Sequence, residues 1–316
     1  MRRQWRKRRV GLALGSGGAR GWAHLGVLET LQERGIDVEV VAGTSMGAVV
    51  GAFFSAGRVS TLRDLAMNLD WKRLRRFFWE ISLSRSGLTD GRRLLEETSR
   101  MLGVREFREL SVPFRAVATD LASGAEAVLS SGNLMPALRA SISIPGLFSP
   151  VRIGPRLLVD GGLVNPVPVN VVRDMGAKTV IAVDVSQGTE PDKTNWSGPA
   201  IPPEGTVAGP LHLPRQSDAE ESAGPLQALE HYFEDVERRV RRLKASWQAR
   251  ETRPDMLEVL VRSVRIMEAQ IARARRKAEP PDLLIEPQVG TIGTLDFQRA
   301  QEAMEAGRVA ARRALE

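Results

Sequence analysis

Apolar positions in the N-terminal part of the chain alternate between short continuous runs and helical spacing. The run from Val10 to Leu14 predicts a buried strand, and the following "GWAHLGVLETLQERG" carries apolar residues three and four positions apart, which predicts a helix that ends at Gly35. A second apolar run near Val38 to Ala42 leads into another helical pattern that extends to about Ala56. This order of strands and helices is typical of a βαβα unit with a parallel sheet.

The same patterns continue along the rest of the chain. From Thr61 to Leu110 the spacing is helical and rich in arginine. Further apolar runs predict buried strands in "PFRAVATDL", "RLLVD", "AKTVIAVDVS" and "PDLLIEP", and a last helix is expected from Asp296 to Leu315. The chain is therefore expected to form an α/β fold.

Composition changes at Gln187 and divides the chain into segments. The residues that follow are rich in Pro, Gly and Ser and lack periodicity, which is typical of a flexible insertion. Two amphipathic helical patterns then predict a helical hairpin. The expected segments are a basic N-terminal arm at 1–8, a core at 9–187, a flexible insertion at 188–225, the helical hairpin at 226–278, and a C-terminal strand and helix at 279–316 that complete the core.

Composition excludes some classes of function. The 316 residues suit one large α/β domain, and the absence of cysteine excludes disulfides and thiolate chemistry. A net charge of +7 favours an anionic membrane surface or an anionic substrate. Nucleic acid is disfavoured, because no nucleic-acid motif is present and there is one tyrosine. The apolar run after the N-terminal arginines is too short for a signal peptide, so a cytoplasmic protein is expected, peripheral at the inner face of the membrane.

A serine between two glycines supplies the first candidate for chemistry. Gly43-Thr44-Ser45-Met46-Gly47 fits the G-x-S-x-G nucleophile elbow, with a strand pattern before it and a helical pattern after it. The small neighbours allow the strand and helix to approach each other around a strained serine. The alternative is a serine that only caps the helix.

The glycine-rich turn "GSGGARG" supplies the second. It lacks the spacing of a dinucleotide fingerprint and the G-K-[ST] of a P-loop. Its unobstructed backbone N–H groups at a helix start predict an anion cradle, which can hold a phosphate or serve as the oxyanion hole for an ester attacked by Ser45. A plain turn with a surface arginine is the alternative.

The general base is harder to predict from the residues. The chain has three histidines, of which only His24 lies near a motif, while His212 falls in the insertion and His231 in the hairpin. The other candidates are carboxylates at strand ends, which meet in one crevice if the strands are parallel. They are Asp120, Asp160 and Asp184, and the Gly161-Gly162 turn after Asp160 sets that aspartate apart. A desolvated aspartate that accepts a hydrogen bond from the serine can act as its base.

Taken together, "GSGGARG", "GTSMG" and "DGG" resemble the patatin-like phospholipases, in particular the bacterial branch related to the neuropathy target esterase domain. The resemblance covers about Arg9 to Gln187 and resumes from Pro281 to Gly307. It implies a three-layer α/β/α fold with a mostly parallel central sheet, and a Ser–Asp dyad that hydrolyses acyl esters of phospholipids or lysophospholipids without a metal or another cofactor.

Residue by residue, the resemblance makes Ser45 the nucleophile and Asp160 the general base. Gly17, Gly18, Ala19 and Arg20 would form the oxyanion loop, and the supporting glycines would be Gly43, Gly47, Gly161 and Gly162. His24 matches a position common in that helix but has no catalytic role in the family. Ser16 departs from the pattern, since many members have glycine there, and 188–277 lies outside the core resemblance.

The expected function is that of a serine hydrolase of acyl esters that acts through an acyl-enzyme; the competing class is a regulatory or lipid-binding module of the same fold that lacks useful turnover. "WKRLRRFFWE" (Trp71 to Glu80) fits either an interfacial segment or an ordinary packed helix. For the basic hairpin, the candidates are anionic lipid, a partner protein and a second copy of the chain. Packing within the chain or a homo-oligomer ranks first.

Overall fold

The structure is a computed structural model that describes residues 9–69, 92–186 and 256–316. Its centre is a mixed sheet whose strands follow the order β5-β6-β3-β2-β1-β7-β8, with β4 paired to β3 beside this path. The pairs β3–β2, β2–β1, β1–β7 and β7–β8 are parallel. The pairs β3–β4, β3–β6 and β5–β6 are antiparallel. The strands span Val10–Leu14 (β1), Val38–Thr44 (β2), Phe114–Asp120 (β3), Glu126–Leu129 (β4), Val151–Ile153 (β5), Arg156–Asp160 (β6), Thr179–Val183 (β7) and Leu283–Ile285 (β8).

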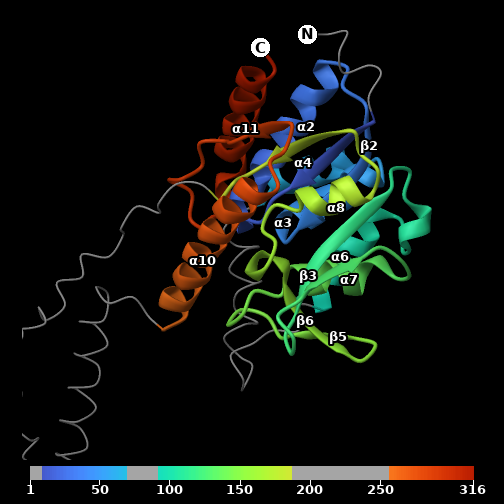
Figure 1. The fold of residues 1–316 in the computed structure, drawn as a ribbon, viewed down its shortest axis with the longest axis vertical. Helices are drawn as coiled ribbons and strands as arrows, with labels where there is room; N and C mark the ends of the chain where they lie inside the picture. Colours follow the sequence, from blue (N-terminus) through green and yellow to red (C-terminus); the bar gives the residue numbers. More distant parts are fainter. Residues whose placement is uncertain (1–8, 70–91, 187–255) are drawn as a thin grey trace, which may run out of the picture. The chain divides into compact units, whose positions relative to one another are not determined.

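Helices cover both faces of this sheet, as Figure 1 shows. The α-helices span Ala23–Glu33 (α2), Met46–Ser55 (α3), Val59–Met67 (α4), Arg92–Leu102 (α6), Leu134–Ser141 (α7), Val169–Asp174 (α8), Met256–Ala278 (α10) and Ala300–Ala314 (α11). Short 3-10 turns lie at Gly18–Trp22 (η1), Phe107–Glu109 (η2), Gly161–Leu163 (η3) and Phe297–Arg299 (η5).

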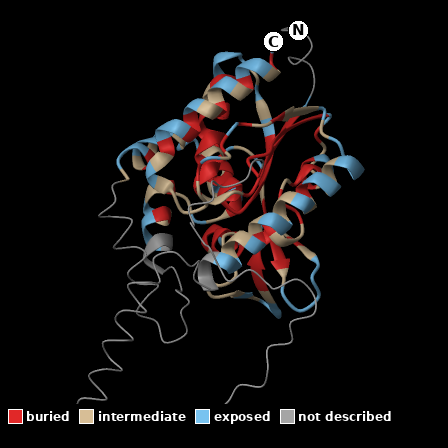
Figure 2. Cartoon of the chain, turned by 90° about the vertical axis from the view of Figure 1, so that its left-hand side faces the viewer, coloured by how far each residue is buried: buried red, intermediate tan, exposed pale blue. Residues whose placement is uncertain are grey.

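Alternation along the central strand explains the layers. Leu12 and Leu14 of β1 pack into the core shared with α2, α3 and α11, while Ala13 between them faces the second core, which contains Val169 and Val172 of α8. Because successive side chains of a strand point to opposite faces, a strand buried throughout must be covered on both sides. The buried strands between partly exposed helices are visible in Figure 2. The expected three-layer α/β/α fold with a mostly parallel sheet is confirmed.

The C-terminal segment belongs to this same unit. α10 and α11 group with the core, α11 packs along α2, and β8 extends the sheet beyond β7. Of the expected hairpin, the second helix is α10, whereas the first helix and the insertion lie outside the described residues, as does the Trp71–Glu80 stretch. In the described part of the chain, no helix combines the length and the apolar character needed to cross a membrane.

Candidate active site

Ser45 occupies the junction between β2, which ends at Thr44, and α3, which begins at Met46. Its backbone has φ 55° and ψ −123°, and it is the one non-glycine residue with positive φ among those described. Such a conformation is strained for a residue with a Cβ atom and recurs at functional sites. The Ser45 side chain makes no capping hydrogen bond to the helix, so its hydroxyl is available for other contacts.

The glycines on either side of this turn are required by close backbone approach. A methyl group built on Gly43 would lie 2.3 Å from the Gly47 carbonyl oxygen, and one built on Gly47 would lie 2.2 Å from the Leu14 carbonyl oxygen. Both contacts are to backbone atoms, which cannot swing aside as a side chain can. The G-x-S-x-G spacing therefore lets β2 and α3 fold tightly enough to hold Ser45 on the turn.

Two strands that meet end to end bring Asp160 to the serine. β4 pairs with residues 116–119 of β3 along one side of that strand. Consequently β2, whose Thr44 pairs with Val117, and β6, whose Asp160 pairs with Ala118, both lie along its other side. β6 runs antiparallel to β3, so β2 and β6 point toward each other and their ends meet. The sequence predicted that Asp160 would reach the site at the end of a strand parallel to β2. That prediction is wrong, because β6 is antiparallel to β3 and therefore to β2.

The Ser45 hydroxyl donates a hydrogen bond of 2.7 Å to Asp160 Oδ2. The other carboxylate oxygen, Oδ1, accepts the backbone N–H of Gly162 at 2.8 Å. Ser45 is 4% exposed and Asp160 is completely buried. Burial away from water raises the pKa of Asp160 to about 7, against the opposing effect of these two hydrogen bonds. Asp160 is therefore a stronger base than a solvated aspartate, and it points at the serine proton.

A second serine that the sequence reasoning missed supports the turn. Ser141, at the end of α7, accepts the backbone N–H of Ser45 at 2.9 Å and donates to the Val117 carbonyl oxygen at 2.6 Å. Its hydroxyl thus ties the strained turn to β3. On the other side, Thr119 donates to the Asp160 carbonyl oxygen at 2.7 Å. The sequence offers no local signal for either role, since both residues act through contacts distant in the chain.

The glycine-rich turn lies next to the serine. Some of its backbone N–H groups are bonded within the protein, and others have no acceptor. The Ala19 N–H is bonded to the Thr294 carbonyl oxygen at 2.8 Å, and the Arg20 N–H is bonded to that of Gly17 at 3.2 Å. Of the four residues expected in the oxyanion loop, Ala19 and Arg20 therefore have backbone N–H groups that are already bonded within the protein. Among the described residues, the N–H groups of Gly17 and Gly18 have no hydrogen-bond acceptor. Gly18 has a φ of 55°, which glycine adopts without strain.

The guanidinium of Arg20 anchors this turn. It is buried and donates to the backbone carbonyl oxygens of Ile292 at 2.6 Å and Gly290 at 2.9 Å. Arg20 therefore joins the turn to the C-terminal segment that follows β8. This long-range role explains why a buried arginine stands in an otherwise glycine-rich loop.

The other candidates for a general base have different partners. His24 Nε2 lies 2.8 Å from the Gly15 carbonyl oxygen and must donate to it, because a carbonyl oxygen only accepts. Burial lowers the pKa of His24 to about 4, so its ring is neutral at pH 7. Asp120 caps a turn by accepting the N–H of Ala122, and Asp184 accepts the N–H and hydroxyl of Ser186. His212 and His231 lie outside the described residues.

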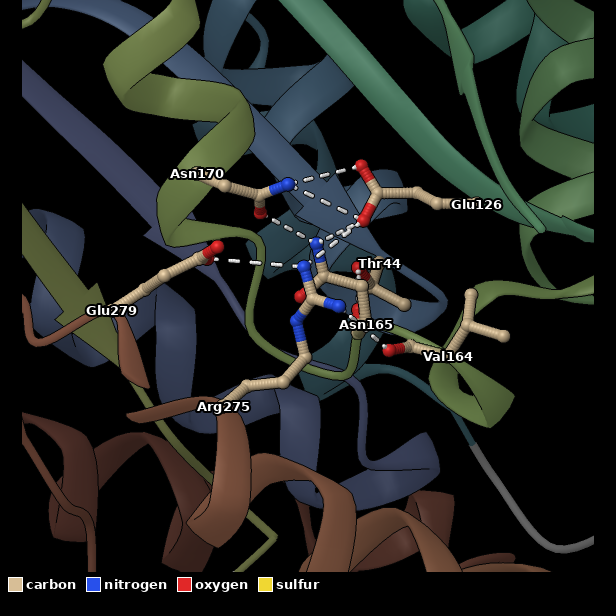
Figure 3. Close-up of polar contacts among 7 residues, drawn as sticks. All are labelled: Thr44, Glu126, Val164, Asn165, Asn170, Arg275 and Glu279. Atoms are coloured by element: carbon tan, nitrogen blue, oxygen red, sulfur yellow. Dashed lines mark hydrogen bonds and ion pairs between the residues drawn. The ribbon is translucent and has the colours of Figure 1, made fainter. Parts of the chain in front are cut away.

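A polar network fastens the loop after Asp160 to its surroundings, as Figure 3 shows. The Thr44 hydroxyl donates to the Asn165 carbonyl oxygen at 2.8 Å, and the Asn165 side-chain amide donates to Glu126 Oε2 at 2.8 Å. Arg275 of α10 reaches the same Glu126 oxygen at 3.3 Å, and Asn170 also contacts this carboxylate. The residue before the nucleophile, the loop after Asp160 and α10 are thereby connected.

Comparisons with known proteins identify the family of the chain. A family model described as patatin-like phospholipase matches residues 12–173. An uncharacterised NTE family protein of Mycobacterium tuberculosis (strain H37Rv) is 34% identical over 335 residues, which cover 98% of this chain and 91% of that protein. Patatin-like phospholipase domain-containing protein 7 of Rattus norvegicus is 36% identical over 193 residues, which cover 59% of this chain and 14% of that protein. The resemblance inferred from the motifs is confirmed, and the chain belongs to the patatin-like phospholipase family.

Proposed function

We propose that the chain is a serine hydrolase of acyl esters, of the phospholipase A or lysophospholipase type, in which Ser45 and Asp160 form a catalytic dyad. The observation that carries the proposal is the hydrogen bond of 2.7 Å from Ser45 Oγ to Asp160 Oδ2 at a strained turn. The neutral His24 is bonded to the Gly15 carbonyl oxygen. The family supports a lipid ester as the substrate class.

In the first half of the reaction, Ser45 Oγ attacks the ester carbonyl carbon while its proton moves to Asp160. The negative charge then resides on the former carbonyl oxygen, where the N–H groups of Gly17 and Gly18 stabilise it as an oxyanion hole. Asp160 returns the proton to the leaving alcohol as the carbon–oxygen bond breaks, which leaves an acyl-serine.

In the second half, water loses a proton to Asp160 as it attacks the acyl carbon. The Ser45 oxygen leaves as the new tetrahedral intermediate collapses, takes the proton back from Asp160, and releases a fatty acid. Each proton that Asp160 accepts is given up again within the same half, so the dyad returns to its starting state without a metal or another cofactor.

The same proposal places the chain at the surface of a membrane. The net charge of +7 and the exposed apolar side chains of Ile266 and Met267 on the arginine-rich α10 support peripheral contact with an anionic membrane, at its inner face for a cytoplasmic protein. We also propose that two chains associate through residues 226–278. Sedimentation with vesicles that contain anionic or only neutral lipid tests the membrane contact, and light scattering tests the association.

Hydrolysis assays test the proposed activity. Purified protein is offered a lysophospholipid, a diacyl phospholipid and a short-chain p-nitrophenyl ester, with Ser45→Ala as the matched control. Release of fatty acid by the wild-type protein and not by Ser45→Ala supports the proposal. A stable, correctly folded wild-type protein that binds lipid without hydrolysing any of the three would instead favour the non-catalytic module.

A further inference from the structure

A second carboxyl group lies beside Asp160, and the reaction described above does not use it. It belongs to Glu268 of α10, a helix that packs against η3, the turn that follows Asp160. A methyl group built on Gly162 would lie 2.0 Å from Glu268 Oε1 and 3.2 Å from Asp160 Oδ1. Oxygen atoms of both carboxyl groups therefore flank the same glycine, and a residue with a side chain at 162 would displace Glu268.

The position of Glu268 is fixed from two helical turns away. Arg275 of α10 bonds to Glu126 and to the Val164 carbonyl oxygen, at 3.3 and 3.4 Å, and Glu279 lies 3.8 Å from the same guanidinium. Figure 3 shows how these contacts hold α10 against the loop that follows Asp160. Arg276, one residue further on, lies 3.5 Å from the buried Asp184. Ion pairs to two parts of the core thus set the register in which Glu268 meets the dyad.

Three groups in the described part of the chain act on the Glu268 carboxyl. Burial raises its pKa to about 8, and the charge of Asp160 acts in the same direction. The Ser16 hydroxyl, from the turn after β1, and Arg265, on α10 itself, act in the opposite direction. Ser16 lies close without reaching hydrogen-bond geometry. Two adjacent carboxyl groups in a buried site resist being ionised together.

We propose that Glu268 is a positioning residue of the active site: it stays protonated while Asp160 is ionised, so that the carboxyl pair carries a single negative charge during catalysis. This inference rests on the proposed function and deepens it. Glu268 acts through Asp160 and through the charge of the site, without contacting the reacting atoms. It also gives α10 a role in catalysis that the motifs of the core do not contain.

The charge balance of the first step gives the physical reason. When Asp160 takes the Ser45 proton, one negative charge passes to the oxyanion, and a protonated Glu268 leaves the total at one. An ionised Glu268 raises the total to two before and during this step, and like charges close together repel each other. Ser16, which lies close to Glu268, directly precedes the Gly17–Gly18 pair that would hold the oxyanion. We therefore expect the charge of an ionised Glu268 to repel the oxyanion, so that loss of the Glu268 proton disfavours the transition state.

The test is the pH profile of kcat/KM for p-nitrophenyl ester hydrolysis, with the rate of fluorophosphonate labelling as a second readout. The wild-type profile rises as Asp160 ionises near pH 7 and falls as Glu268 ionises near pH 8. At pH 9 the wild-type kcat/KM is about tenfold below the value expected with Glu268 fully protonated. The reason is that a group is about 90% ionised when the pH is one unit above its pKa. Glu268→Gln stays neutral at every pH, so its activity reaches a plateau and does not fall.

Control variants separate this effect from a structural one. Glu305→Gln makes the same change at an exposed glutamate of α11 and is expected to keep the wild-type pH profile. Glu268→Asp retains a carboxyl group and is expected to keep the alkaline fall in kcat/KM. Glu268→Ala, a second neutral variant, loses it. An alkaline fall that persists in both neutral variants, or a wild-type profile without one, overturns the inference. Failure of the proposed function is recognised separately, because hydrolysis and labelling would then be the same in Ser45→Ala.

Discussion

Ser45 and Asp160 are 115 positions apart in the chain, yet Ser45 Oγ lies 2.7 Å from Asp160 Oδ2. They meet because β2 and β6 run toward each other along the same side of β3, where Thr44 pairs with Val117 and Asp160 with Ala118. The Gly162 N–H holds the second carboxylate oxygen, so the base is oriented from two directions. This relationship carries the proposal of a dyad and leads to the predictions that follow.

Asp160→Asn is expected to lower kcat by about two to four orders of magnitude, which is the usual contribution of a general base. The amide keeps the volume of the carboxyl group but cannot accept the serine proton. Thermal unfolding of the variant should remain cooperative, with a melting temperature that is not below that of the wild type at pH 7, because the neutral amide avoids the cost of ionising a buried carboxyl group. Comparable kcat values for the two proteins would transfer the role of base to another group.

Ser141→Ala is expected to reduce kcat by about tenfold with little change in KM, because the turn that holds Ser45 loses the hydroxyl that accepts its N–H and donates to Val117. A buried N–H left without an acceptor also costs about 1–3 kcal/mol of stability. Steady-state kinetics and denaturant unfolding measure the two effects. Ser141→Thr retains a hydroxyl group and serves as the matched variant, with activity between the two.

Gly43→Ala is expected to destabilise the fold by about 1–3 kcal/mol or more, since its new methyl group would meet the backbone of Gly47 and backbone atoms yield little. Gly35→Ala provides the control. Gly35 has a positive φ, of 65°, but no atom lies within 4 Å of the added methyl group, so only a conformational cost of about 1 kcal/mol is expected. Equal melting temperatures for the two variants would contradict a steric role for Gly43.

The dependence of stability on pH tests the raised pKa values of the two carboxyl groups. Carboxyl groups in the unfolded chain ionise near pH 4, whereas the folded pKa values of Asp160 and Glu268 are raised to about 7 and about 8. The folded state therefore binds more protons, and the stability these groups contribute is complete below pH 4 and lost as pH rises through 7 and 8.

Glu268→Gln removes the part of this loss that belongs to Glu268. Its melting temperature should match that of the wild type at pH 4 and exceed it by a growing margin up to about pH 8. Differential scanning fluorimetry across this range measures the margin. A constant difference at every pH would show that the Glu268 pKa is not raised by folding.

The local parts of the fold could be predicted from the sequence. Short apolar runs and helical spacing located β1, β2, α2 and α3, and the elbow at Ser45 was recognisable because its strand, turn and helix are continuous in the chain. Family resemblance added the three-layer order, which follows from burial of β1 on both faces. These features depend on residues that are close together in the sequence, so local motifs are enough to predict them.

The pairing of distant segments could not be predicted in the same way. β4 and β5 are too short to give a periodic signal, and the antiparallel direction of β6 depends on its partner β3. Ser141 and Glu268 act through contacts with residues far from them in the chain, and neither lies in a motif. Their contributions emerge only when side-chain contacts across the sheet and against α10 are known.

The most direct test of the account is fluorophosphonate labelling of the intact protein at pH 7.5, with the modified peptide identified by mass spectrometry. We expect one adduct, on the peptide that contains Ser45, with no labelling of Ser45→Ala and slow labelling of Asp160→Asn. An adduct that persists in Ser45→Ala, or labelling of Asp160→Asn at the wild-type rate, would contradict the claim that Ser45 is a nucleophile activated by Asp160.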